Sequence, residues 1–180
     1  MKVMYKIAID TYYFGEEKAR TVGVIFNYFS DEAPSQVITV WSTEFEPYQP
    51  GLFYKRELPC ILDCLAQVNL AEFDTIILDG FYKLKGDYGV EWSGLGEHLM
   101  SDLRGKGLLH PDLNIWCVAK TNFCRTDEIS ELVLRGTSEK PLYVQAMRDQ
   151  KGVATLVKNM AGEHRLPKML KILDKETKKK

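Results

Sequence analysis

The 180-residue sequence lacks several features that would place it in a class at once. It contains no run of 18 or more apolar residues, so we expect no membrane-spanning helix. Its first residues, MKVMYKIAID, indicate a strand and lack the long apolar stretch and cleavage site of a secretory signal. The formal net charge is only −1, which argues against a broad polyanion-binding coat but not against a local basic groove. We therefore expect a cytoplasmic, monomeric protein.

The sequence also lacks the cysteine spacing of a disulfide framework or a zinc site. None of its four cysteines, Cys60, Cys64, Cys117 and Cys124, forms a C-x-x-C pair, and the three histidines complete no zinc pattern with them. Cys60 and Cys64 lie four residues apart, on the apolar face of an expected helix. We interpret the cysteines as reduced thiols, mostly buried, in a cytoplasmic protein.

What the sequence does contain is a regular order of strand and helix signals. Three segments rich in Val, Ile, Tyr and Phe, separated by short polar turns, predict an antiparallel meander; they span residues 3–10, 21–29 and 36–41. Two nearly all-apolar runs, at 75–78 and 113–119, predict strands that are buried on both faces. Helices are expected at 52–68, 93–103, 152–160 and 167–174.

This order predicts an α/β fold: a mixed sheet, with the antiparallel meander followed by parallel strands, flanked by helices. Pro59 lies inside the first expected helix and indicates a kink or a restart there. The last two helices should pack on one face of the sheet. We expect one domain over residues 1–180, in which the basic segment 175–180 is a disordered tail.

Acidic residues stand at the ends of two predicted strands. Asp10 follows Ile7–Ile9, and Asp79 follows the run 75–78; if these strands are neighbours, the two carboxylates meet at one edge of the sheet. Glu57 lies in the helix after a stiff Pro-Tyr-Gln-Pro-Gly turn. Clustered carboxylates require a cation, and oxygen ligands select Mg²⁺ or Mn²⁺, which can assist phosphodiester hydrolysis. Taken singly, each acid is equally typical of a turn or a solvated helix face.

Six segments in the same order resemble the endonuclease V family, deoxyinosine-directed nucleases with an RNase H-like fold. They are AID, PYQPG with FYKRE, IILDG, GLGEHL, WCVAK, and KPLYV followed later by HRLP. The order and approximate spacing agree from Tyr5 to about Leu173. The resemblance implies an RNase H-like domain that hydrolyses a phosphodiester bond near a flipped-out deaminated base, in DNA repair.

The resemblance also implies a role for each matching residue. Asp10, Glu57 and Asp79 would bind Mg²⁺ or Mn²⁺, and Lys120 would stabilise the charge of the scissile phosphate. The turn Pro47, Tyr48, Gln49, Pro50 and Gly51 would form a wedge whose ring replaces the stacking of an extruded base. The base pocket would be lined by Gly51, Phe53, Gly80, Gly94 and Leu95. The partner would be DNA or RNA.

Two stretches depart from the family. After IILDG, the run FYKLKGDYGVEWSG is longer and lacks the histidines that family members carry there. In YVQAMRDQ, Arg148 stands near the position of a family histidine; a guanidinium does not ligate Mg²⁺ but can bind phosphate. Asp149 next to it could offer an oxygen instead. His98, in GLGEHL, matches a family histidine, although a purely structural role fits it as well.

Three functions remain open on the sequence. The first is an active metal-dependent endonuclease, which the retained acids and Lys120 favour. The second is a catalytically inactive nucleic-acid-binding protein of the same fold with an altered base pocket, which the missing histidines favour. The third is an unrelated α/β domain with its acids in turns and Tyr48 in the core.

Overall fold

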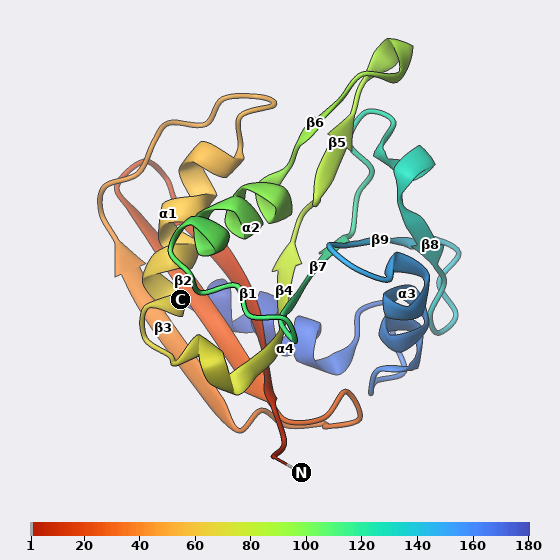
Figure 1. Cartoon of the computed structure of the whole chain (residues 1–180), viewed down its shortest axis with the longest axis horizontal. Helices are drawn as coiled ribbons and strands as arrows, with labels where there is room; N and C mark the ends of the chain where they lie inside the picture. The colour runs from red at the N-terminus through yellow and green to blue at the C-terminus, as the bar shows by residue number, and fades with distance from the viewer. Residues whose placement is uncertain (1) are drawn as a thin grey trace.

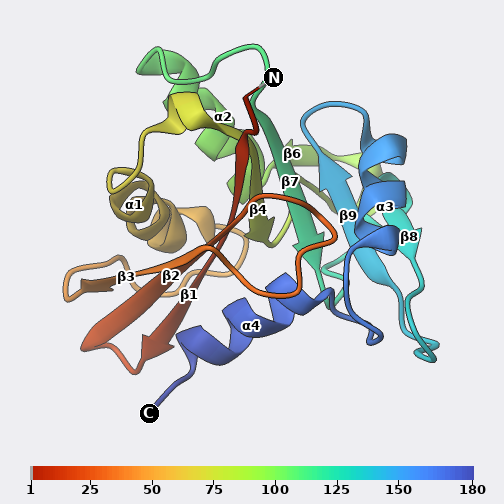
Figure 2. The same ribbon diagram turned by 90° about the horizontal axis from the view of Figure 1, so that it is seen from below.

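The computed structural model describes residues 2–180 as a seven-stranded mixed sheet with helices on both faces (Figures 1 and 2). The strand order is β3-β2-β1-β4-β7-β9-β8, and a separate two-stranded hairpin is formed by β5 and β6. The strands are β1 (Tyr5–Phe14), β2 (Lys18–Phe26), β3 (Gln36–Ser42), β4 (Phe73–Asp79), β5 (Lys83–Lys85), β6 (Glu91–Ser93), β7 (Asn114–Ala119), β8 (Glu131–Val133) and β9 (Leu142–Ala146).

The strand pairing confirms the predicted mixed sheet. Strands β1, β2 and β3 form an antiparallel meander, and β1, β4 and β7 run parallel. Strands β9 and β8 continue the sheet in antiparallel fashion. Strand β1 extends four residues beyond Asp10, because Phe14 still pairs with Lys18 of β2. The carboxylate predicted at the end of this strand therefore lies within it.

The helices divide between the two faces of the sheet. Helices α1 (Tyr54–Leu65) and α2 (Leu95–Gly105) cover one face, and α3 (Gln150–Asn159) and α4 (Lys168–Thr177) cover the other (Figure 2). The 3₁₀ turns are η1 (Leu70–Glu72), η2 (Asp87–Gly89) and η3 (Thr126–Ile129). The packing of the last two helices on one face agrees with the prediction.

Each face of the sheet has its own hydrophobic core, as the alternation of side chains along buried strands requires. On β1, Ile7 and Ile9 pack with α1 and α2, whereas Ala8 packs on the side of α3 and α4. Asp10, an even-numbered residue like Ala8, therefore belongs to the α4 side of the sheet. Because of this alternation, α4 is a helix whose side chains can contact Asp10.

Of the two alternatives for Pro59, the restart is wrong, because helix α1 runs without interruption across this residue. The kink stays a prediction, and the extent of the disordered tail was wrong. Residues 175–177, placed in a disordered tail by the sequence, form the last turn of α4, and Thr177 is buried. Arg20 binds this turn by donating hydrogen bonds to the carbonyls of Glu176 and Thr177, each at 3.2 Å. Within residues 2–180, no helix combines the length and apolar character needed to cross a membrane.

Candidate functional site

The carboxyl ends of the parallel strands form the floor of a cavity of about 480 Å³. Asp10 follows Ile9, which pairs with Leu78, so Asp10 lies beside Asp79 on the neighbouring strand. Lys120 follows directly after β7. Glu57, in the first turn of α1, completes the group from a fourth element. All four predicted residues line this one cavity, so the sheet brings together acids that are distant in sequence.

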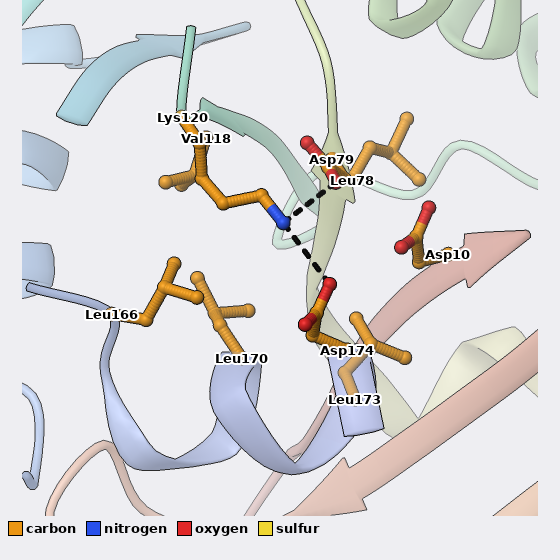
Figure 3. A pocket seen from close by; sticks show the side chains of 9 residues that line it. All are labelled: Asp10, Leu78, Asp79, Val118, Lys120, Leu166, Leu170, Leu173 and Asp174. Carbon is orange, nitrogen blue, oxygen red and sulfur yellow. Dashed lines mark hydrogen bonds and ion pairs between the residues drawn. The ribbon is translucent and has the colours of Figure 1, made fainter. Parts of the chain in front are cut away.

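A fourth carboxylate, Asp174 of α4, also lines the cavity and was not predicted. Figure 3 shows the Lys120 side chain pointing toward Asp79 and Asp174, with Asp10 on the strand beyond them. The Lys120 Nζ donates a hydrogen bond to Asp174 Oδ1 at 3.0 Å and lies 4.0 Å from Asp79 Oδ2. The sequence carried a signal for this residue: Leu170, Leu173, Asp174 and Thr177 recur at helical spacing and share one face of α4.

Acids that lie close together in a poorly solvated cavity have raised pKa values. Asp10 keeps some exposed surface, but protein atoms surround most of its carboxyl group. This desolvation, together with the nearby Asp79, raises the pKa of Asp10 to about 8. Burial, followed by the charges of Asp10 and Asp79, raises the pKa of Glu57. Burial also raises the pKa of Asp79, although Lys120 opposes that effect.

Asp174 behaves differently from the other three acids. Its burial is opposed and outweighed by hydrogen bonds from Lys178 and Lys120, and its pKa falls below the usual value. Burial alone would lower the pKa of Lys120, but the hydrogen bond to Asp174 and the charge of Asp79 raise it. Lys120 is thus held as a cation among the acids. Its single positive charge is smaller than the negative charge that the acids would carry if all were ionised.

The chemistry of these side chains fits a hard divalent cation. The donors are carboxylate oxygens, which Mg²⁺ and Mn²⁺ prefer. Their pKa values are raised first by burial and then by the neighbouring acids, and a bound cation would favour the ionised carboxylates. Among residues 2–180, no three His, Cys, Asp or Glu side chains are already arranged as a metal site. Metal binding at these acids therefore requires their side chains to draw together.

The lining of the cavity also includes every residue predicted for the base pocket: Gly51, Phe53, Gly80, Gly94 and Leu95. Two of these glycines are needed for backbone geometry. Gly80 has φ of 142°, and a Cβ atom on Gly94 would lie 2.5 Å from the Phe81 carbonyl oxygen. Gly94 therefore allows the start of α2 to lie close to the backbone that follows β4.

The turn before α1 projects Tyr48 outward. Tyr48 is 54% exposed, lines the cavity, and meets the Phe53 ring edge-on at a centroid distance of 5.5 Å. Gly51 has φ of 77°, and the amide of Leu52 donates to the carbonyl of Gln49 at 3.0 Å, which closes the turn. Its neighbours Pro47, Gln49 and Pro50 are exposed but do not line the cavity. The alternative that placed Tyr48 in the core is wrong.

Arg148 does not reach the cavity. Strand β9 runs antiparallel to β7, so the residues after β9 lie near the start of β7 and far from its carboxyl end. There Arg148 donates hydrogen bonds to the carbonyls of Pro111 and Leu113. Asp149 caps α3 by accepting from the amide of Gly152 at 3.2 Å. The expected phosphate contact of Arg148 and the compensating oxygen of Asp149 are therefore absent from this cavity.

The stretch that departs from the family folds into the β5–β6 hairpin, which projects from the body of the molecule (Figure 1). Gln145 of β9 anchors its base by accepting hydrogen bonds from the amides of Tyr82 and Lys83, each at 2.8 Å. Leu84 and Phe81 face the cavity. The run that lacks the histidines of the family pattern therefore contributes apolar side chains to the cavity.

His98 has a structural role in the described chain. Its ring stacks on Tyr54, with centroids 3.5 Å apart and an angle of 15° between the planes, which joins α2 to α1. Burial lowers the pKa of His98 and so favours the neutral ring. His98 does not line the cavity. The structural interpretation of this residue is the one that the geometry favours.

The sheet order, with carboxylates on adjacent central strands, defines an RNase H-like protein. Within that class, the structure is similar to endonuclease V structures. Ciona intestinalis endonuclease V, in complex with a 24mer DNA containing an inosine followed by a ribo-adenosine, aligns with a TM-score of 0.74 and 21% identity, covering 98% of this chain and 85% of that one.

Two further endonuclease V structures support the same fold. The human protein aligns with a TM-score of 0.69 and 18% identity, covering 97% of this chain and 83% of the human one. The Bacillus subtilis protein aligns with a TM-score of 0.66 and 15% identity, covering 98% and 79%. The sequence matches no protein-family model and no curated protein. The chain is thus endonuclease V-like in fold and divergent in sequence.

Proposed function

We propose that this protein is a divergent, metal-dependent endonuclease of the endonuclease V type. It would hydrolyse a phosphodiester bond near a flipped-out, inosine-like base in DNA or RNA, as part of DNA repair. One observation carries the proposal: Asp10, Glu57, Asp79 and Lys120 come from four elements and line a single cavity. The likeness to structures bound to inosine-containing DNA supports the choice of substrate.

In this proposal, one group of cavity residues binds the base and another carries out the hydrolysis. The volume of about 480 Å³ is in the range that encloses a small ligand, and a nucleobase is a ligand of that kind. Main-chain groups beside Gly80 and Gly94 read the edge of the base, and Phe53 and Leu95 pack on its faces. Tyr48 enters the duplex and replaces part of the lost stacking, which is worth about 1–3 kcal/mol per base.

The acids and Lys120 in the same lining would carry out the hydrolysis. Asp10, Glu57 and Asp79 would hold Mg²⁺ or Mn²⁺, and the bound ion would neutralise charge at the phosphate and activate water. Lys120 donates to a phosphate oxygen, and Asp174 keeps the lysine pointed at the cavity through the 3.0 Å hydrogen bond. An all-oxygen donor set compensates for the family histidines that this chain lacks. A cytoplasmic location and a monomeric state remain predictions.

The test is cleavage of end-labelled oligonucleotides with Mg²⁺ or Mn²⁺. The panel contains inosine, uracil, mismatch and flap substrates, each as DNA and as RNA. We expect a cut near the modified base, and an at least 100-fold slower cut by Asp79→Asn, because loss of a supporting metal contact alone costs about 10–100-fold. Asp112→Asn, which changes an exposed acid outside the cavity, is the matched control and should cleave normally.

The second candidate is a nucleic-acid-binding protein without turnover. It is favoured by Lys120, whose ammonium group already pairs with Asp79 and Asp174, and by the lack of a preformed metal site among residues 2–180. If the wild-type protein shifts the same oligonucleotides in a gel but cuts none of them with either metal, this second function replaces the first.

A further inference from the structure

Beyond the cavity, the ends of β1, β2 and β3 form a surface of aromatic rings and cations. We call it the aromatic platform, and it consists of Tyr12, Phe14, Lys18, Arg20 and Trp41. In the sheet register, Tyr12 lies opposite Arg20, Arg20 lies opposite Trp41, and Phe14 lies opposite Lys18. Residues directly opposite each other share a face, so all five side chains stand on the same side of the sheet. The rings contact one another: Phe14 lies 5.0 Å from Tyr12 and 5.8 Å from Trp41, between centroids.

The platform is continuous with the cavity. Asp10, Tyr12 and Phe14 are alternate residues of β1 and therefore project from one face, about 7 Å apart along the strand. Tyr12 lines the cavity together with Asp10. Helix α4 packs against β1 and β2 (Figure 2) and ends at Thr177. Arg20 binds the carbonyls of its last turn, so the platform lies beside the end of this helix. A chain leaving the cavity along β1 would pass over these rings.

Two cations are fixed against the rings. The Arg20 guanidinium lies 4.6 Å from the centre of the Trp41 ring and 5.1 Å from that of Phe14. Its hydrogen bonds to the carbonyls at the end of α4 hold it in that place. The Lys18 ammonium lies 5.1 Å from the Trp41 ring. Because the chain as a whole has a net charge of −1, this concentration of cations is local.

Much of the aromatic surface is nevertheless open to solvent. Trp41 is 48% exposed and Tyr12 is 38% exposed. Glu16 and Glu17, in the turn between β1 and β2, limit the platform at its far end, because their charge repels phosphates. Exposed rings next to fixed cations are the combination with which proteins bind single strands: the rings stack on bases and the cations pair with phosphates. A duplex hides its base faces and cannot use such rings.

We propose that the aromatic platform binds an extended single-stranded segment of nucleic acid that continues from the segment in the cavity. The inference rests on the proposed function, because that function places nucleic acid in the cavity. Trp41 and Tyr12 stack on unpaired bases, and Lys18 and Arg20 neutralise the adjacent phosphates. Substrates with a single-stranded extension should therefore bind better than blunt duplexes.

The test measures binding separately from cleavage. A fluorescein-labelled, unmodified single-stranded 12-mer is titrated with the protein in EDTA, and anisotropy gives the Kd. We expect Trp41→Ala to raise the Kd about fivefold or more, since one stacked base contributes about 1–3 kcal/mol. Trp41→Phe keeps a ring and should restore most of the affinity. Tyr28→Ala, which removes a 54% exposed ring beyond the opposite end of β2, is the matched control and should bind as wild type.

The outcomes distinguish this inference from the proposed function. If the wild-type protein binds no single strand, or if Trp41→Ala and Tyr28→Ala bind equally, the platform proposal is overturned. Equal displacement of the 12-mer by polyglutamate would likewise overturn it, since only charge would then be recognised. Binding that depends on Trp41 supports it even where no oligonucleotide is cut, in which case the nuclease proposal fails alone.

Discussion

At the scale of single residues, the cavity is defined by acids that the fold holds in a poorly solvated place. The pKa of Asp10 rises to about 8 because of desolvation and the nearby Asp79. In a metal-free protein this carboxyl therefore keeps its proton at neutral pH. A bound cation would stabilise the ionised form of this carboxyl, so metal binding and proton release are linked.

We expect the free energy of unfolding in EDTA to fall as the pH rises from about 4 to about 8. The folded protein keeps a proton on Asp10 up to about pH 8, whereas the unfolded chain loses it near 3.8. Over this interval the folded state binds more protons, so rising pH lowers stability, by at most about 1.4 kcal/mol per pH unit for one group. Urea unfolding at several pH values measures the slope.

Asp10→Asn should flatten this slope, because the amide does not titrate and can still accept the hydrogen bond from the Thr11 amide. Asp112→Asn should keep the wild-type slope. Addition of Mn²⁺ at pH 8 should stabilise the wild-type protein more than Asp10→Asn, by mass action on the folded state. Equal slopes for wild type and Asp10→Asn would contradict the interpretation of this carboxyl.

At the scale of elements, a substitution in the turn between β3 and α1 distinguishes a binding role of Tyr48 from a structural one. Tyr48→Ala should change the free energy of unfolding by no more than about 0.5 kcal/mol, because its ring is exposed and packs only edge-on against Phe53. Binding to an inosine-containing duplex should weaken about fivefold or more, as the wedge loses its stacking surface. Chemical unfolding and anisotropy titration measure the two effects.

Tyr48→Phe provides the control for this turn, since it keeps the ring and should bind as wild type. A loss of several kcal/mol in the alanine variant would instead mean that the ring supports the fold. Unchanged affinity of Tyr48→Ala for the duplex would remove the turn from the binding surface and leave Phe53 and the glycines to hold the base.

The helices and strands also show which parts of the fold could be predicted from the sequence. Five strands of the main sheet and the four helices were predictable, because buried strands and amphipathic helices carry clear periodicity. Strands β8 and β9, at the edge of the same sheet, were not predicted. Asp10 and Asp79 were predictable as neighbours because parallel strands end at a common edge. The β5–β6 hairpin was not predicted, since its strands have three residues each and form no part of the main sheet.

Two residues of the candidate site show where pattern alone was insufficient. Arg148 was placed near the metal by its position in the sequence, but the antiparallel direction of β9 carries it to the other end of β7. Asp174 was overlooked although its spacing places it on the apolar face of α4, because that spacing does not show which strands the face covers. Its place at the cavity depends on how α4 packs across the sheet, which is a property of tertiary structure.

At the scale of the whole molecule, one buried arginine holds the chain between α3 and α4 in place. Arg135 is 5% exposed, and its guanidinium donates to five backbone carbonyls of the segment 158–165. The shortest contacts are with Met160 at 2.6 Å and His164 at 2.8 Å. Next to it, Gly136 has φ of 61°, and a Cβ atom there would lie 2.4 Å from the Glu163 carbonyl oxygen. This contact sets the position of α4, and hence of Asp174.

Arg135→Lys should therefore lower both stability and activity. A lysine keeps the charge but has three donors on one nitrogen, so it cannot reach carbonyls that surround a planar guanidinium. Buried carbonyls left without donors should cost about 2–4 kcal/mol, which urea unfolding measures. Cleavage should slow even where the variant is fully folded, because a shifted α4 withdraws Asp174 from Lys120. Arg104→Lys, on the exposed side of α2, is the control and should alter neither quantity. If Arg135→Lys loses stability but cleaves at the wild-type rate, the position of α4 does not govern the site, and Lys120 must be oriented by Asp79 alone.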